Sequence, residues 1–330
     1  MQFNFAKPAL GVVYCTTMSR PDSVLTLALL YGFEGKREAR VSAIALTGAS
    51  LGAAHFCDAV RGFYVGTGMF VNSNRYLPVG LDADAITNGD PPMLKAAYAK
   101  YPSSVNDVSD TAEVTALVRN SLTAQNDGNA VVVLSASAAK LLAMLGLPGV
   151  RDLVAAKVKM LVISDGLPDP ASSRQLLAEW PTRIVLCGID VGDALPFPGE
   201  SLDKDFAWSP AHPVADAYRA FRTMPYDTPS QDLAAIYYAV HPDSEFFHLS
   251  EPGTIEFTDD GRSTFRQSPE GKHRQLVIDA TQKDSLIRTF VEITSAKPVP
   301  RPQFRRRIAD ADAAKAAEEK KPEAPKQDPK

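Results

Sequence analysis

The sequence has three cysteines, no long apolar run and no excess of basic side chains. The odd number and wide spacing of Cys15, Cys57 and Cys187 fit neither a disulfide framework nor a zinc knuckle. Because Cys15 and Cys187 end apolar runs, we expect buried free thiols and a reducing compartment. The 35 Lys and Arg against 39 Asp and Glu give a net charge of −4, which argues against a nucleic-acid partner.

Signals for export or membrane insertion are also missing from this numbering. Met1 to Leu10 contains no unbroken apolar stretch, and no segment approaches the roughly 20 apolar residues of a membrane helix. We therefore expect a cytoplasmic protein with no membrane partner. A mature form whose export signal lies outside this numbering is the alternative.

Common enzyme motifs do not occur either. No G-x-G-x-x-G follows the first apolar run, and neither a Walker A motif nor a G-x-S-x-G elbow is present. None of the histidines pairs with an acid at the spacing of a zinc-binding helix. The sequence therefore does not indicate dinucleotide, nucleoside triphosphate, serine hydrolase or zinc chemistry.

What the sequence does contain is an alternation of short β-branched runs with helical patterns. The predicted strands are Gly11–Cys15, Arg40–Leu46, Leu77–Gly80, Ala130–Leu134, Lys159–Ile163 and Arg183–Cys187. The predicted helices are Ser23–Phe33, Gly52–Tyr64, Asp110–Ala124, Ala138–Leu145, Arg151–Ala156 and Ala171–Glu179. This alternation predicts an α/β fold with a mainly parallel sheet and helices on both faces.

The second half changes in pattern without a boundary that would divide the core. It predicts helices at Val214–Thr223, Gln231–Val240 and Ser285–Ser295, a hairpin at Gly253–Arg266 around Asp259-Asp260-Gly261, and a last strand at Leu276–Asp279. We expect residues 1–297 to form a single domain. Residues 298–330 are rich in Ala, Lys, Glu and Pro, and we expect a disordered charged tail.

Ligands of parallel sheets bind outside the carboxyl ends of the strands. The residues that follow the predicted strands include Ser135-Ala136-Ser137 and Ser164-Asp165-Gly166. Three acids, Asp82, Asp165 and Asp190, lie at the same edge. Helix capping is an equally weighted role for each of them.

Several segments carry a resemblance to a known family, including the following two. Asp22-Ser23-Val24-Leu25-Thr26-Leu27-Ala28-Leu29-Leu30 is similar to D-D-A-L-A-L-A-L-L, and Pro225-Tyr226-Asp227-Thr228-Pro229-Ser230-Gln231-Asp232-Leu233 is similar to P-Y-D-R-P-T-W-D-L. Both are motifs of the inosine-uridine-preferring nucleoside hydrolase family, and the resemblance extends from about Ala9 to Ser295. It implies a nucleoside hydrolase-like fold and hydrolysis of the N-glycosidic bond of a nucleoside or related ribosyl compound. In the family, aspartates hold a calcium ion and one of them activates water as a general base.

The resemblance also shows which acids are missing. Cys15 and Thr17 stand where the first two aspartates of the family's D-T-D triplet would be, so Thr17 occupies the place of the general base. Asp22 takes a ribose-contacting place and Ser23 replaces a metal ligand, whereas a register shifted by one residue makes Asp22 the ligand. Asp232 matches a retained metal ligand.

Further positions follow from the same resemblance. Gln231 replaces a His or Trp that lies beside the base of the nucleoside in the family. Ala138 would offer a backbone carbonyl to the metal, and Ser137 stands in the ligand-binding segment. Asp165 or Asp190 would have to replace the lost acids if catalysis is retained.

These substitutions lead to two hypotheses. The first is a hydrolase of reduced or altered activity with calcium bound weakly or lost, because calcium affinity depends on the number of charged ligands. The second is a non-catalytic relative that binds a ribosyl ligand or a protein partner. The family also suggests a homo-oligomer. Both hypotheses require Asp22 and Asp232 to face each other across one crevice.

Overall fold

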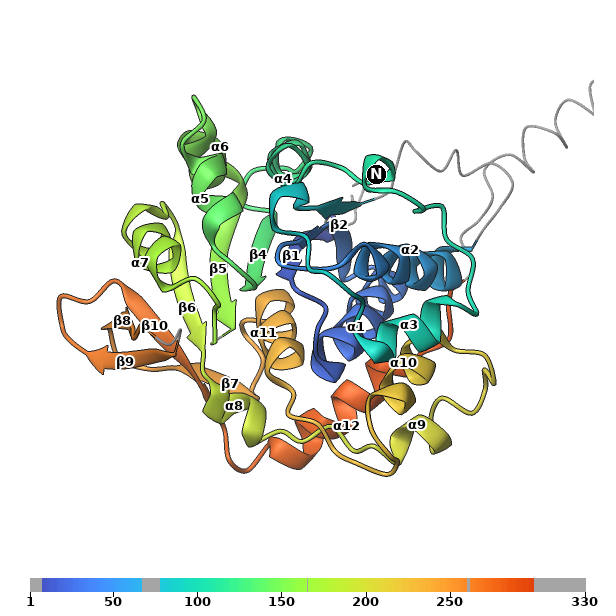
Figure 1. Cartoon of the computed structure of the whole chain (residues 1–330). Coiled ribbons are helices and arrows are strands. Elements are labelled where there is room, and N and C mark those ends of the chain that lie inside the picture. The colour runs from blue at the N-terminus through green and yellow to red at the C-terminus, as the bar shows by residue number, and fades with distance from the viewer. Residues whose placement is uncertain (1–7, 67–77, 165, 260–261, 300–330) are drawn as a thin grey trace, which may run out of the picture. The chain divides into compact units, whose positions relative to one another are not determined.

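The computed structural model describes residues 8–66, 78–164, 166–259 and 262–299, and a parallel sheet runs through its centre (Figure 1). The strands of this part follow the order β3-β2-β1-β4-β5-β6. Their bounds are β1 Leu10–Thr16, β2 Ala39–Leu46, β3 Val79–Leu81, β4 Ala130–Ser135, β5 Val158–Ser164 and β6 Arg183–Cys187. Every neighbouring pair is parallel. All carboxyl ends of these strands therefore lie at one edge.

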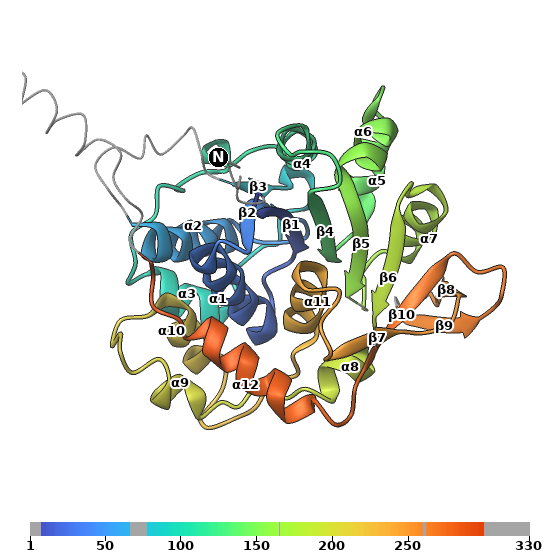
Figure 2. The ribbon, with the colours of Figure 1, turned by 180° about the vertical axis from the view of Figure 1, so that it is seen from behind.

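The last strands extend this sheet beyond β6. β10 (His273–Ile278) runs parallel to β6, and β8 (Gly253–Phe257) pairs antiparallel with β10. β9 (Ser263–Gln267) completes the hairpin with β8, and the short β7 (Phe247–Leu249) pairs antiparallel with β10. This hairpin projects from the sheet in both views (Figures 1 and 2).

Two groups of helices cover the two faces of the sheet. One group packs with the larger buried cluster and consists of α1 (Pro21–Lys36), α2 (Leu51–Val65), α3 (Pro92–Tyr98), α8 (Ile189–Asp193), α9 (Ser201–Lys204), α10 (Pro213–Phe221), α11 (Gln231–Val240) and α12 (Lys283–Thr294). The other consists of α4 (Val114–Thr123), α5 (Ala139–Leu145), α6 (Val150–Lys157) and α7 (Pro170–Glu179). β1 alternates between them, since Val12 and Tyr14 join the first cluster and Val13 and Cys15 the second.

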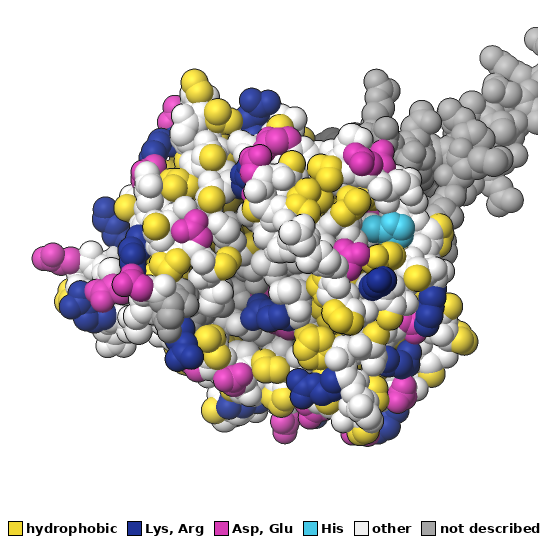
Figure 3. Space-filling view, viewed as in Figure 1, with side chains coloured by type: hydrophobic (Ala, Val, Ile, Leu, Met, Phe, Trp, Pro, Cys, Tyr) yellow, Lys and Arg dark blue, Asp and Glu magenta, His cyan; other side chains and the backbone are white. Residues whose placement is uncertain are grey.

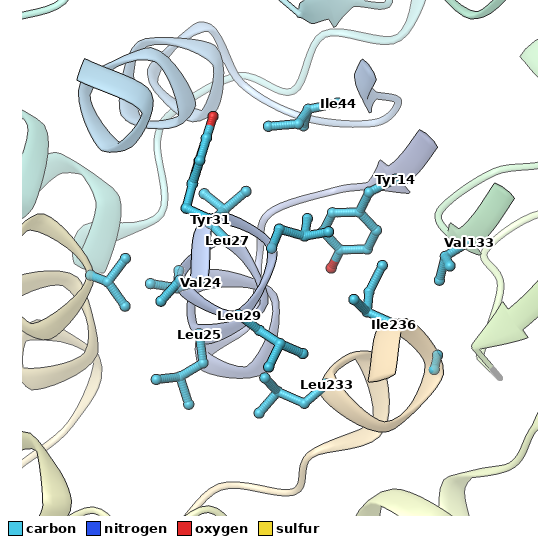
Figure 4. Packing of buried hydrophobic residues seen from close by; sticks show 14 of the residues in the cluster. Tyr14, Val24, Leu25, Leu27, Leu29, Tyr31, Ile44, Val133, Leu233 and Ile236 are labelled. Atoms are coloured by element: carbon cyan, nitrogen blue, oxygen red, sulfur yellow. The ribbon is translucent and has the colours of Figure 1, made fainter. Parts of the chain in front are cut away.

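α1 is buried on all sides through most of its length. Every residue from Pro21 to Phe33 is buried, because the helix packs against β2, α10, α11 and α12. Figure 4 shows its side chains Val24, Leu25, Leu27 and Leu29 pointing in different directions into the core. A uniformly apolar sequence such as this one is typical of a central helix rather than an amphipathic surface helix.

The predicted α/β fold class is confirmed. The predicted strands and helices occur within a few residues of their expected bounds, and α11 has the predicted bounds Gln231–Val240. Leu77, at the start of one predicted strand, lies outside the described residues, as do Asp260 and Gly261 of the predicted hairpin turn. The sequence reading did not predict α3, α8, α9 or β7.

Residues 1–298 form one unit of the structure and residues 299–330 another, of which only Val299 is described. The predicted disorder of the tail therefore stays a prediction. Among the helices described here, none has the length and apolar character needed to cross a bilayer.

Candidate functional site

Side chains from three neighbouring strands converge on Asp232 at the carboxyl edge of the sheet. Tyr14 of β1 donates its hydroxyl to Asp232 Oδ2 at 2.6 Å, and Ser164 of β5 donates to Oδ1 at 2.6 Å. Ser135 of β4 lies 2.8 Å from Oδ1 and 3.0 Å from Oδ2. Arg20 Nη2, from the loop after β1, donates to Oδ1 at 2.9 Å. Asp232 is fully buried, so these four side chains satisfy a carboxylate that water does not reach.

The sheet topology brings these groups together. β1, β4 and β5 are adjacent in the sheet, and Thr16 pairs in register with Ser135. α11 packs on β4 and β5 and begins beside their carboxyl ends. Tyr14 points from β1 toward α11, which carries Leu233 and Ile236 (Figure 4). Residues distant in sequence therefore meet at the first turn of α11, where a negative charge is favoured by the helix dipole.

Arg20 lies at the solvent side of this cluster. Its side chain is 45% exposed, whereas that of Asp232 is 0% exposed. Nη2 also donates to Ser135 Oγ at 3.2 Å. The negative charge of Asp232 is the main reason that the pKa of Arg20 is raised. Arg20 therefore stays charged and is fixed between a strand end and the start of α11.

The loop that presents Arg20 contains an unusual backbone conformation. Met18 is buried and has φ of 55°, in the left-handed region that non-glycine residues rarely adopt. Its N–H donates to Thr16 Oγ1 at 3.1 Å, and its side chain packs in the core. This conformation turns the chain between the end of β1 and Pro21, the first residue of α1.

Asp22 contacts the first turn of α11. It accepts backbone N–H groups there and does not pair with the Asp232 carboxylate around a metal ion. Its Oδ2 accepts the backbone N–H of Asp232 at 2.7 Å, and Oδ1 accepts that of Leu233 at 3.3 Å. Ser230, at the N-cap position of α11, makes no side-chain capping bond. Asp22 therefore caps α11 from a different helix. Burial, and secondarily the charge of Asp232, raise the pKa of Asp22 to about 8.

Three other residues were expected at the positions of the general base and the metal ligands, and each makes contacts away from Asp22 and Asp232. Thr17 Oγ1 lies 2.7 Å from Ser19 Oγ, and the Ser23 hydroxyl donates to the carbonyl of Arg20 at 3.1 Å. The Ala138 carbonyl accepts the N–H of Leu142 at 2.9 Å in the first turn of α5. None of these contacts joins Asp22 to Asp232, and the predicted roles of these residues stay predictions.

Three more of the predicted residues, Ser137, Gln231 and Asp190, lie around the same edge. Ser137 accepts the N–H of Ala139 at 3.2 Å and is 3.4 Å from Asp169. Gln231 is buried and donates Nε2 to the carbonyl of Cys187 at 3.0 Å. Asp190 is exposed on α8. Asp165 lies outside the described residues.

The calcium site implied by the resemblance can be compared with these contacts. Calcium takes six to eight oxygen ligands. Here both oxygens of Asp232 and both oxygens of Asp22 accept hydrogen bonds, and a guanidinium lies against Asp232. Within the described ranges, no three His, Cys, Asp or Glu side chains are grouped so as to hold a metal ion. The residues present at Asp22 and Asp232 do not fit a calcium ion.

Sequence reasoning found Asp22 and Asp232 but missed four of their neighbours. Ser135 and Ser164 are the first residues of the strand-end segments already identified. Tyr14 carries the one hydroxyl inside the predicted strand Gly11–Cys15. Arg20 gave no signal, because its partner lies 212 positions away in the sequence.

Solved structures of other proteins have the same architecture. The fold is an α/β fold with a polar cluster at the carboxyl edge of a parallel sheet. It is the nucleoside hydrolase fold, as solved structures show: an inosine-uridine preferring nucleoside hydrolase from Bacillus anthracis (10% identity, 86% of this chain and 99% of that chain, TM-score 0.59) and a purine-preferring ribonucleoside hydrolase from Gardnerella vaginalis (11% identity, 86% and 99%, TM-score 0.61).

A third structure of this fold is the type III effector protein XopQ complexed with adenosine diphosphate ribose. It is 11% identical, covers 88% of this chain and 96% of that chain, and has a TM-score of 0.52. No protein-family model matches the chain, and no curated protein matches it. The predicted resemblance is therefore confirmed for the fold.

Proposed function

We propose that this protein binds a ribosyl compound, such as a nucleoside or adenosine diphosphate ribose, at the carboxyl edge of its sheet and does not hydrolyse it by a calcium-dependent route. The observation that carries the proposal is the contact set of Asp232. Its oxygens are satisfied by Tyr14, Arg20, Ser135 and Ser164, all of which are groups of the protein itself.

The location and chemistry of the edge support ligand binding. Ligands of open parallel sheets bind outside the carboxyl ends of the strands, where Arg20, Ser135 and Ser137 lie. Arg20 Nε and Nη1 make no hydrogen bond within the described residues, so they are available to the oxygens of a ligand. The structure of XopQ contains adenosine diphosphate ribose, which supports this ligand class for the fold.

The residues at the base position support the loss of hydrolysis. Thr17 is a hydroxyl paired with Ser19, and no carboxylate accompanies them in the hydrogen bonds of the described residues. A neutral hydroxyl is a poor acceptor for a proton from water at neutral pH. Asp22, the nearest retained acid in the sequence, is buried and caps α11.

The face of the molecule drawn in Figure 3 supports a small-molecule ligand rather than a nucleic acid. On the face shown in Figure 3, Lys and Arg side chains are interspersed with Asp and Glu side chains and do not form one basic patch. A nucleic-acid site requires a continuous cationic surface.

Two measurements on the full chain test this proposal. Calorimetric titration with inosine, uridine and adenosine diphosphate ribose measures binding, and assays for released base and sugar measure hydrolysis with and without calcium. We expect saturable binding of a ribosyl ligand and no calcium-stimulated turnover. Calcium-dependent release of base would show a hydrolase instead, and the absence of binding across the panel would contradict the ligand class.

A pair of serine variants locates the ligand. Ser135→Ala removes a hydroxyl that holds both Arg20 and Asp232, and we expect about fivefold weaker ligand binding, as for the loss of one hydrogen bond. Ser173→Ala is the matched control, since Ser173 is a buried serine of α7 whose hydroxyl bonds, among the described residues, to the Asp169 carbonyl alone. The control variant should bind as the wild type does.

A further inference from the structure

A cationic side chain of the protein occupies the place at Asp232 where the family resemblance implies a metal ion. We propose that Arg20 is a built-in substitute for a divalent cation: its guanidinium neutralises Asp232, and its removal creates a calcium-binding site. This makes Arg20 a positioning and charge-balancing residue of the candidate site.

The buried carboxylate of Asp232 needs a balancing positive charge. Asp232 is 0% exposed, and a buried carboxylate without a partner is strongly destabilising. In the described residues, the one salt bridge to Asp232 comes from Arg20, at 2.9 Å. Tyr14, Ser135 and Ser164 contribute neutral hydroxyl donors. The charge that a bound metal would have to supply is therefore supplied by Arg20.

Hydrogen bonds from the protein occupy the oxygens of Asp232 that a metal would use. Asp232 Oδ1 accepts hydrogen bonds from Arg20, Ser135 and Ser164, and Oδ2 accepts from Tyr14. A calcium ion that approached Oδ1 would meet N–H and O–H hydrogens rather than ligand oxygens. Removal of the guanidinium leaves hydroxyl groups that can rotate and offer oxygens.

Arg20 lies on the solvent side of the buried acid, and its side chain is 45% exposed. Its backbone is held in place, because its carbonyl accepts the Ser23 hydroxyl at 3.1 Å and the Val24 N–H at 3.3 Å. The guanidinium therefore covers the approach to Asp232 rather than sampling the surface.

This inference rests on the proposed function only in placing a ligand beside Arg20, and it can be tested without any ligand. The test is calcium titration by calorimetry together with thermal unfolding in the presence and absence of calcium. The proteins are the full-length wild type, Arg20→Ala, Arg20→Lys, Asp232→Asn and the double variant Arg20→Ala/Asp232→Asn. Arg61→Ala is the matched control, because Arg61 also pairs with a buried carboxylate, Asp58, at 2.8 Å.

We expect Arg20→Ala alone to bind calcium, with a dissociation constant of about 1 mM, comparable to weak extracellular calcium modules. Its unfolding temperature should rise with calcium, and the double variant should lose this response. Wild type, Arg20→Lys and Arg61→Ala should show no such effect. If Arg20→Ala is unfolded in buffer, calcium should restore its folding.

Three results would overturn the inference. One is calcium binding by the wild type that Asp232→Asn abolishes, and another is a folded Arg20→Ala protein that gains no calcium affinity. The third is an Arg20→Ala protein that stays unfolded at all calcium concentrations. Failure of ribosyl binding by the wild type would instead contradict the proposed function and leave these outcomes unaffected.

Discussion

The carboxyl group of Asp22 accepts the backbone N–H of Asp232 at 2.7 Å, although 210 positions separate them in the sequence. The two residues were predicted to face each other across one crevice. They do lie close together, but both are buried and Asp22 contacts the backbone of Asp232 directly. The contact, however, joins a carboxylate to a helix N-terminus rather than two carboxylates to one ion. Asp22 therefore stabilises the start of α11, and α11 in turn presents Asp232 to the strands.

The Asp22 carboxyl should make stability depend on pH. Burial raises its pKa to about 8, above its usual value of 3.8. Between these values the folded protein holds a proton that the unfolded chain releases. The contribution of Asp22 to the free energy of unfolding is therefore fully present below about pH 4 and is lost as the pH rises through 8. We expect a contribution of at most about 1.4 kcal/mol per pH unit. Denaturant unfolding of wild type and Asp22→Asn across this range measures it, and an unchanged slope in the variant would contradict this assignment.

Tyr14 and Tyr31 form a matched pair for the hydroxyl contacts. Both are buried, but the Tyr14 hydroxyl donates to Asp232 whereas the Tyr31 hydroxyl has no partner among the described residues. Tyr14→Phe should reduce the free energy of unfolding by about 1.5–3 kcal/mol, the range for a hydrogen bond to a charged group. Tyr31→Phe should be neutral or stabilising. Equal effects of the two substitutions in chemical denaturation would show that the hydrogen bond of Tyr14 to Asp232 does not stabilise the fold.

The burial of α1 predicts a large effect of truncation there. Leu27 is 0% exposed in the core (Figure 4), so Leu27→Ala should destabilise the protein by about 2–5 kcal/mol through lost burial and a cavity. Leu147→Ala, at an exposed leucine outside the helices, should change stability by less than about 0.5 kcal/mol. Urea unfolding compares the two. A small effect at Leu27 would mean that α1 is not the central helix.

The C-terminus of α1 offers a stabilising substitution. Arg37 is exposed and adopts φ of 62°, where glycine has no steric penalty. Arg37→Gly should increase the free energy of unfolding by roughly 0.5–1 kcal/mol. Arg40→Gly, in the exposed part of β2, should decrease it by a similar amount. Thermal unfolding of both variants checks the signs, and destabilisation by Arg37→Gly would contradict the left-handed conformation.

The sequence predicted the parallel sheet well because buried strands are short, β-branched and interrupted by helical patterns. It predicted less well where elements are short or polar. α3 starts at consecutive prolines, and α8 begins directly after β6, so neither has a long periodic pattern. β10 starts at His273, three residues before the predicted strand, because its first residues are polar and only partly buried.

The candidate site was predicted only as far as local motifs extend. Asp22 and Asp232 belong to recognisable segments, whereas the link between Arg20 and Asp232 arises from the packing of α11 against three strands. Residue type alone does not distinguish a carboxylate that is free to bind a metal from one already satisfied by protein donors. The hydrogen-bond distances at Asp22 and Asp232 make that distinction.

The proposed binding of a ribosyl ligand at this edge of the sheet does not require a metal ion. Calorimetric titration of the wild type with the ribosyl ligand that binds best, once with calcium and once with a chelator, measures whether this is so. We expect the two dissociation constants to agree within about twofold, with no base released during either titration. Binding that disappears in the chelator and returns with calcium would contradict the account.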